Sequence, residues 1–160
     1  MKRTENLNIV EVLPITSPKK LKDILPVSDT VVENVLNARN AIRSILEGED
    51  SRILMIVGPC SIHDPEAALE YASCLKSLAD EVSDTILVVM RVYFEKPRTT
   101  VGWKGLINDP DLDDTFQINK GLKLARGLLA QLADQGLAAG TEYLDLISPQ
   151  YLADLVSWGA

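Results

Sequence analysis

An uninterrupted apolar run reads Ile53-Leu54-Met55-Ile56-Val57 and ends at Gly58-Pro59-Cys60. A strand with one face in water alternates apolar and polar residues, whereas a strand buried on both faces is apolar throughout. A second apolar run covers residues 86–94, and a third strand is predicted over residues 138–144. We therefore expect an α/β protein with a parallel sheet, whose first two strands are buried on both faces.

Amphipathic helices are predicted before, between and after these strands, because apolar residues recur there at intervals of three and four. Their expected ranges are 29–48, 65–82, 116–135 and 148–158. Asp29 and Asp64 are the expected N-caps of the first two helices, and Pro65 suits the first turn of the second. Gly48 and Gly136 are typical residues at which a helix ends. Each strand is thus followed by a helix, as in repeated βα units.

The chain divides into an N-terminal arm and helix, residues 1–50, and three βα units, residues 51–160. Ser17-Pro18 opens a further short helix in the arm, which is too small to have its own core. Strands buried on both faces need neighbours on both sides, and βα units can close into an eight-stranded barrel of about 250 residues. We interpret the chain as the N-terminal portion of a longer (β/α)8 TIM barrel, with a complete small α/β domain as the alternative.

The composition is acidic, with 16 Lys and Arg residues against 23 Asp and Glu residues and a net charge of −7. Such a surface disfavours nucleic acid and anionic membranes as partners. No secretory leader and no long apolar run is present, so a cytoplasmic protein without a membrane segment is expected. Cys60 and Cys74 are too few for a disulfide framework, and Cys74 is expected only to pack.

Basic residues gather in residues 91–105, where four cations accompany a single acid, Glu95. The stretch begins at the carboxyl end of the second strand, where ligands bind in parallel βα folds. Arginine is suited to phosphate and carboxylate, so an anionic ligand is one interpretation. A solvated basic loop is the other. Arg91 favours the ligand, because a charge within an apolar strand is costly unless it meets a partner.

The residues after the first strand combine a thiol, an imidazole and a carboxylate in Cys60, His63 and Asp64. One interpretation is a transition-metal site with Cys60 as thiolate ligand. The alternatives are a buried packing cysteine at Cys60 and a helix cap at Asp64.

Two longer motifs carry a specific resemblance. They are Gly58-Pro59-Cys60-Ser61-Ile62-His63-Asp64 and Arg91-Val92-Tyr93-Phe94-Glu95-Lys96-Pro97-Arg98-Thr99-Thr100-Val101-Gly102-Trp103-Lys104-Gly105. Together with residues 106–110 and 148–155 they resemble the type I 3-deoxy-D-arabino-heptulosonate 7-phosphate (DAHP) synthases. The resemblance implies a (β/α)8 TIM barrel that condenses phosphoenolpyruvate with erythrose 4-phosphate and water, releasing phosphate, as the first step of the shikimate pathway. It also implies a divalent metal cofactor of the Mn, Fe, Co or Zn type.

The same resemblance assigns roles by motif position. Cys60 becomes a metal ligand, while Arg91 and Lys96 contact phosphoenolpyruvate. Lys96, near both substrates, is the candidate proton donor to the forming alkoxide. His63 belongs to the motif but is not expected to be a ligand. The residues implied for erythrose 4-phosphate are Lys96, Pro97, Arg98 and Thr99.

The rest of the family's site is absent from these residues. Family members take a histidine, two carboxylates and further phosphate-binding cations from the later part of the barrel. We therefore predict that this chain alone neither holds the metal tightly nor turns over substrate. The alternative function is a non-catalytic half-barrel that binds phosphate compounds or regulates an intact homologue.

Regulation is the last implication of the resemblance. In this family the N-terminal arm and the region after the third strand are associated with feedback inhibition by an aromatic amino acid. The arm also contributes to subunit contacts, so a homo-oligomer is expected for the full-length protein. The corresponding residues are Asn6, Leu146, Ile147, Pro149 and Gln150. By local chemistry alone, Pro149 could simply begin a helix and Gln150 could be solvated.

Overall fold

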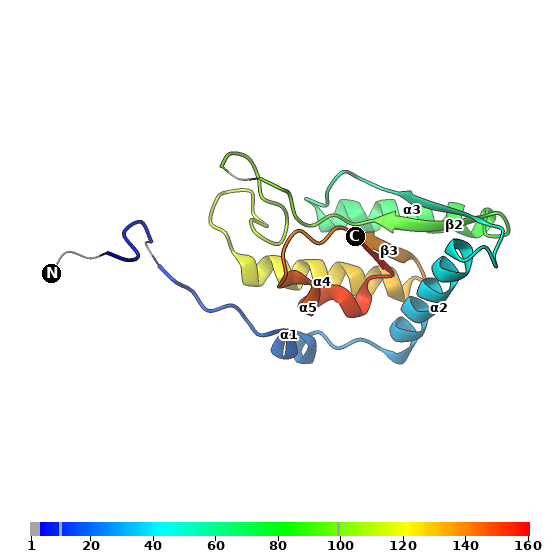
Figure 1. Ribbon diagram of the computed structural model, residues 1–160, viewed down its shortest axis with the longest axis horizontal. Helices are drawn as coiled ribbons and strands as arrows, with labels where there is room; N and C mark the ends of the chain where they lie inside the picture. Colours follow the sequence, from blue (N-terminus) through cyan, green and yellow to red (C-terminus); the bar gives the residue numbers. More distant parts are fainter. Residues whose placement is uncertain (1–3, 10, 99) are drawn as a thin grey trace.

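The computed structural model describes residues 4–9, 11–98 and 100–160. Two N-terminal helices precede an alternation of strands and helices (Figure 1). The elements are α1 (Pro18–Ile24), α2 (Asp29–Leu46), β1 (Ile53–Val57), α3 (Pro65–Glu81), β2 (Ile86–Arg91), α4 (Ile118–Asp134), β3 (Ala138–Thr141), α5 (Ser148–Leu152), the 3-10 helix η1 (Ala153–Leu155) and β4 (Trp158–Gly159). Within these described ranges, no helix is both long and apolar enough to cross a membrane.

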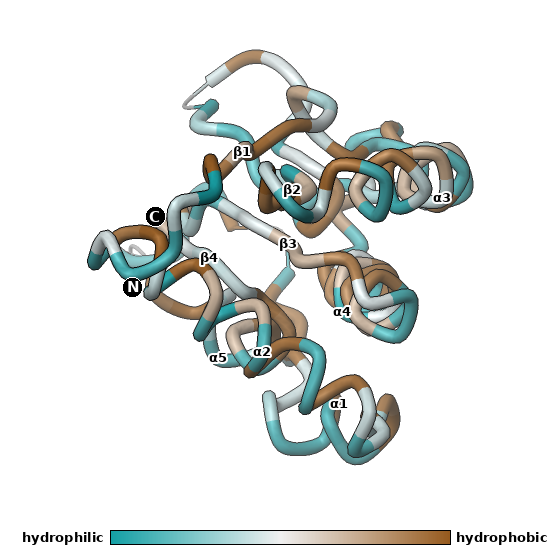
Figure 2. Tube along the Cα trace, turned by 90° about the vertical axis from the view of Figure 1, so that its right-hand side faces the viewer, coloured by the Kyte–Doolittle hydropathy of each residue, from teal (hydrophilic) through white to brown (hydrophobic). Residues whose placement is uncertain are grey.

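The four strands form one parallel sheet in the order β1-β2-β3-β4, so each lies beside its successor in sequence. Ile53 is opposite Ile86, and Val89 is opposite Ala138. The strands follow an arc in Figure 2, with α3 and α4 on its outer side. Connections that always step to the next strand build a barrel wall, whereas a doubly wound sheet reverses its strand order. The α/β class and the barrel-type arrangement predicted from the sequence are confirmed.

The two faces of the sheet are covered by different helices. Val88 and Met90 of β2 are buried in the large core that α3 and α4 share with the outer face. Val89 points to the inner face, where Ile42 of α2 covers it together with Ala138. Because Ala138 begins β3, α2 closes the inner face at the amino ends of the strands. The carboxyl ends are left to the loops.

Helix starts follow local capping chemistry, with one difference from prediction. Asp64 caps α3 as expected, accepting hydrogen bonds from two backbone N–H groups at 2.9 and 3.2 Å. The predicted cap of α2, Asp29, is wrong, because Ser28 Oγ accepts from the N–H of Val31 at 3.2 Å. The backbone of Ser28 is extended, as an N-cap requires, while Asp29 is already helical. Gly136 ends α4 with a φ of +72°, as predicted.

The last predicted helix is shorter than expected. The sequence predicts a helix that reaches Trp158, but α5 has five residues and Trp158 lies in β4. The guanidinium of Arg39 donates hydrogen bonds to the carbonyl oxygens of Ala153, at 2.6 Å, and Val156, at 2.8 and 3.0 Å. These bonds from α2 hold the chain in a turn before the fourth strand. Local spacing does not report such a long-range contact.

Strand β1 is more exposed than its apolar sequence predicts. Ile53 is 62% exposed, and Met55 and Ile56 are also exposed, whereas Val89 and Met90 of β2 are fully buried. Among the described strands β1 pairs only with β2, so it is an edge strand. The middle of β2 is therefore buried as predicted, whereas β1 is exposed where the interpretation as part of a longer barrel requires a further neighbour. Composition shows that a strand suits burial and does not show whether a neighbour covers it.

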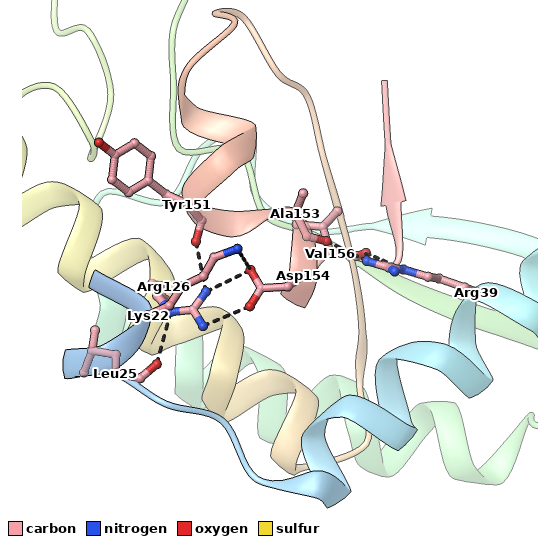
Figure 3. Close-up of polar contacts among 8 residues, drawn as sticks. All are labelled: Lys22, Leu25, Arg39, Arg126, Tyr151, Ala153, Asp154 and Val156. Atoms are coloured by element: carbon pink, nitrogen blue, oxygen red, sulfur yellow. Dashed lines mark hydrogen bonds and ion pairs between the residues drawn. The ribbon is translucent and has the colours of Figure 1, made fainter. Parts of the chain in front are cut away.

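A buried arginine ties the N-terminal region to the end of the chain (Figure 3). Arg126 of α4 is 1% exposed and forms a bidentate ion pair with Asp154, with both N–O distances 2.9 Å. It also donates to the carbonyl oxygens of Tyr151, at 2.9 Å, and Leu25, at 3.2 Å. Lys22 of α1 adds a partly exposed ion pair to Asp154 at 3.3 Å. One guanidinium thus joins α4, the end of α1 and the turn after α5.

We predict that Arg126→Met lowers the free energy of unfolding by about 3–5 kcal/mol, because it leaves a carboxylate and two carbonyl groups without their buried donor. Lys22→Met is the matched control and should cost less than about 1 kcal/mol, because solvent screens that pair. Denaturant unfolding of both variants measures the difference. Equal losses would contradict the assignment of the contact to Arg126.

Candidate active site

Three loops meet at the carboxyl ends of β1, β2 and β3, because these strands are parallel neighbours. The loops span residues 58–64, 92–117 and 142–147. Gly58 lets the first loop lie against the end of β2, since a Cβ at this position would be only 2.7 Å from the carbonyl oxygen of Arg91. The fold therefore brings together both long motifs identified in the sequence.

Cys60, Lys96 and Arg91 form a compact polar cluster. Lys96 Nζ lies 3.0 Å from Cys60 Sγ and donates to the Cys60 carbonyl oxygen at 3.2 Å. Arg91 Nη2 donates to the same oxygen at 3.3 Å. The hydrogen bond from Lys96, assisted by its charge and by those of Arg91 and Arg98, lowers the pKa of the Cys60 thiol. Cys60 is exposed, so the alternative of a buried packing thiol is wrong, and a thiolate is accessible here.

Arg91 has the partners that a charge next to an apolar strand requires. Its guanidinium lies 4.0 Å from the centroid of the Tyr93 ring, in addition to the contact with Cys60. Its Nε is buried and has no hydrogen-bond partner in the part of the chain that the structure describes. An unpaired buried donor costs about 1–3 kcal/mol. The folded chain therefore carries this cost at the end of β2.

The loop after β2 folds back on itself beside the cluster. The N–H of Lys96 donates to the carbonyl oxygen of Lys104 at 3.0 Å, and Lys104 Nζ donates to that of Arg98 at 3.1 Å. The loop borders a cavity of about 430 Å³. Its lining residues are Glu95, Lys96, Pro97, Arg98, Lys104, Asn108, Leu144 and Asp145. Three of the five predicted substrate residues, Lys96, Pro97 and Arg98, thus line the same cavity. Arg91 is not among its lining residues, and Thr99 lies outside the described residues.

The wall of this cavity also contains a buried carboxyl group, that of Glu95. Its side chain is 7% exposed, and Ser148 Oγ donates to Glu95 Oε2 at 3.0 Å. Burial, followed by the hydrogen bond and charge of Asp145, raises the pKa of Glu95 to about 7. Asp145 Oδ1 accepts hydrogen bonds from the N–H groups of Ile147 and Ser148, both at 2.6 Å. A protonated Glu95 can therefore donate to the Asp145 carboxylate.

The sequence-based predictions did not assign a role to Glu95 or Asp145. The available signal was that Glu95 is the only acid in the otherwise basic residues 91–105. The expected packing role of Cys74 is wrong, because Cys74 is exposed on α3. The buried face of that helix is formed by Ala68, Ala72 and Leu75.

The model of the DAHP synthetase I family matches residues 25–160. The chain belongs to this family. It is similar to the Phe-sensitive phospho-2-dehydro-3-deoxyheptonate aldolase of Escherichia coli strain K12, with 54% identity over 158 residues, covering 99% of this chain and 45% of that protein. It is equally similar to the Tyr-sensitive enzyme of Salmonella typhimurium, with 54% identity over 155 residues, covering 97% of this chain and 44% of that protein.

A solved structure of a DAHP synthetase I relative has the same fold. The phospho-2-dehydro-3-deoxyheptonate aldolase from Francisella tularensis SCHU S4 matches with a TM-score of 0.91 and 51% identity, covering 95% of this chain and 45% of that chain. The chain therefore spans a little under half the length of these relatives. The resemblance to type I DAHP synthases that the motifs indicated is confirmed.

The DAHP synthetase I family is in general metal-dependent. The question for this chain is therefore which of its residues could ligate a metal ion. Cys60 offers an accessible thiol with a lowered pKa, which suits a transition metal. Over residues 4–9, 11–98 and 100–160, however, no three His, Cys, Asp or Glu side chains gather as a metal site would require. Asp64 serves as the cap of α3, which is the alternative that the sequence offered for this residue. Cys60 is therefore the candidate ligand that the described residues offer.

The predicted regulatory residues occupy two separate places. Leu146 is 91% exposed and Ile147 is also exposed, at the end of the loop after β3. Pro149 and Gln150 follow in the first turn of α5. Asn6 is exposed in the N-terminal arm, which extends away from the helices in Figure 1. The structure thus groups four of the five residues, and their regulatory role stays a prediction.

The raised pKa of Glu95 predicts a pH-dependent stability. Between its usual value of 4.5 and about 7, the folded chain holds a proton that the unfolded chain has lost. This stabilising contribution is fully present below pH 4.5 and is lost as the pH rises through 7. Its size is about 1–3 kcal/mol after allowance for solvent screening.

Glu95→Gln should remove this part of the pH profile, because glutamine keeps the hydrogen bonds and has no proton to lose. The free energy of unfolding, measured by urea at pH 5, 6, 7 and 8, tests this expectation. Glu70→Gln, on the exposed side of α3, is the matched control and should keep the profile of the unchanged chain. A Glu95→Gln profile with the original slope would show that Glu95 is not the titrating group.

Proposed function

We propose that this protein condenses phosphoenolpyruvate with erythrose 4-phosphate and water to give DAHP and phosphate, the first step of the shikimate pathway. The observation that carries the proposal is the meeting of Cys60, Arg91 and Lys96 beside a cavity that Lys96 and Arg98 line. Both substrates are phosphate esters, and the chain has a net charge of −7. Cations gathered at one cavity in an acidic chain favour anionic ligands.

The residue roles follow the chemistry of the condensation. Arg91 and Lys96 neutralise the phosphate and carboxylate of phosphoenolpyruvate. Erythrose 4-phosphate is held by residues 96–99. The enol carbon forms a bond to the aldehyde carbon, and the aldehyde oxygen takes a proton as it becomes a hydroxyl group. Lys96, at the meeting point of both sites, donates that proton, after which water adds and phosphate leaves.

The cofactor and partners are part of the same proposal. We assign a divalent cation of the Mn, Fe, Co or Zn type, with Cys60 as one ligand; such an ion polarises the aldehyde when bound. We also assign an aromatic amino acid as inhibitor, a homo-oligomeric state and a cytoplasmic location. Relatives named Phe-sensitive and Tyr-sensitive are both 54% identical to this chain, so overall identity does not select the inhibitor.

The activity is tested on the protein as its gene encodes it, supplied with both substrates and Mn²⁺, by measuring DAHP and released phosphate. We expect product, and we expect Lys96→Ala to lower kcat/KM by about 100-fold or more through loss of a transition-state contact. Lys123→Ala, on the exposed face of α4, is the control and should retain the activity. Binding of phosphoenolpyruvate without any product would favour a non-catalytic half-barrel instead.

For residues 1–160 alone we predict no turnover, because their described part offers only Cys60 as a metal ligand. The purified chain is assayed beside the gene-encoded protein, with the same substrates and Mn²⁺. Phosphoenolpyruvate should still bind, measured by calorimetry, since Arg91 and Lys96 are in place. Formation of DAHP by the isolated chain would contradict this prediction.

A further inference from the structure

Glu95 and Lys96 are consecutive residues whose side chains contact different neighbouring loops. Glu95 accepts a hydrogen bond from Ser148 Oγ, at the start of α5. Lys96 reaches Cys60, in the loop after β1, at 3.0 Å. The loop after β2 lies between these two partners, since β2 pairs with both β1 and β3. This dipeptide therefore links the loops on either side of it.

The carboxyl of Glu95 is the better anchored of the two side chains. It is almost completely buried and interacts with Asp145 as well as Ser148. Asp145 in turn is held by the N–H groups of Ile147 and Ser148, each at 2.6 Å. A carboxyl that keeps its proton can donate to the carboxylate of Asp145, whereas two carboxylates would repel. The raised pKa of Glu95 is consistent with the first arrangement.

The backbone around Glu95 leaves little freedom for adjustment. Gly105 has a φ of +105°, and a Cβ there would lie 2.7 Å from the Cα of Glu95. On the next residue, the N–H of Lys96 is bonded to the carbonyl oxygen of Lys104 at 3.0 Å. Lys104 and Gly105, where the loop folds back, thus restrain the backbone of Glu95 and Lys96. The Glu95 carboxyl group adds a second restraint through Ser148 and Asp145.

We propose that Glu95 is a positioning residue whose carboxyl, anchored on Asp145 and Ser148, holds the ammonium group of Lys96 against Cys60 at the cavity wall. Lys96 has a flexible stem of four methylene groups, and its reach is restricted only if its backbone is held. Loss of the anchor would let Lys96 leave the thiol while the sheet stays intact. The catalytic consequence rests on the function proposed above, whereas the contact between Lys96 and Cys60 does not.

The contact is tested by the reactivity of Cys60 in the 160-residue chain, kept metal-free with a chelator. Iodoacetamide reacts with the thiolate, so the rate at Cys60 at pH 7 reports the nearby ammonium group. Cys74, exposed on α3, is the internal reference, because unfolding would expose both cysteines alike. Mass spectrometry of the two peptides gives the ratio of the rates.

Glu95→Ala is expected to lower the Cys60/Cys74 ratio about threefold or more, close to the value for Lys96→Met, in which the cation itself is lost. Glu95→Gln should keep the ratio within about twofold of the unchanged chain, because its amide preserves both hydrogen bonds. Ser148→Ala removes one of the two hydrogen-bond partners of Glu95. Its Cys60/Cys74 ratio should lie between those of Glu95→Ala and Glu95→Gln. An unchanged ratio in Glu95→Ala, or a Glu95→Gln ratio as low as that of Glu95→Ala, would overturn the proposal.

The catalytic consequence is tested on the gene-encoded protein with both substrates and Mn²⁺. Glu95→Ala should lower kcat more than it raises either KM, with substantial rescue by Glu95→Gln. A loss confined to KM would overturn the positioning role in catalysis. If the unchanged protein makes no DAHP while Glu95→Ala still lowers the Cys60 ratio, the proposed function fails and the positioning of Lys96 stands.

Discussion

The parallel pairing of β1 with β2 and of β2 with β3 places the three loops of the candidate active site. Parallel neighbours end on the same side, so the loops that follow them must meet there. Gly58 makes the meeting close, since any side chain at this position would collide with the backbone of Arg91. The cluster of Cys60, Arg91 and Lys96 is the direct result. Without this register, the two motifs would be separate loops with no shared chemistry.

Neighbouring charges and burial shift the pKa values of two groups at this end of the sheet. The chain is acidic as a whole, yet Arg91, Lys96 and Arg98 all lower the pKa of one thiol. On the neighbouring wall, burial and Asp145 have the opposite effect on a carboxyl group and raise the pKa of Glu95. The charged groups that line the cavity are therefore not interchangeable. Lys96 and Arg98 line the cavity, whereas the Glu95 carboxyl group is buried and bonded to Ser148.

Two further arginines hold the frame in which this site lies. Arg39 of α2 binds the carbonyl oxygens of the turn after α5, and Arg126 of α4 binds the carboxylate of Asp154 in the same turn. The turn delivers the chain into β4, beside β3. It also fixes α5, which presents Ser148 to Glu95. The buried polar contacts of the helices and the contacts at the cavity therefore belong to one continuous structure.

The sequence by itself determined the order of strands and helices, the cap at Asp64, the stop at Gly136 and the basic loop, because each is set by residues within a few positions of one another. Its motifs also identified the family. Only the tertiary structure decided that β1 lies at an edge, that α5 ends before β4 and that Cys74 is exposed. It alone placed Glu95 against Asp145, fifty residues away in the chain. Such contacts depend on how distant elements pack, and that information is absent from any local pattern of residues.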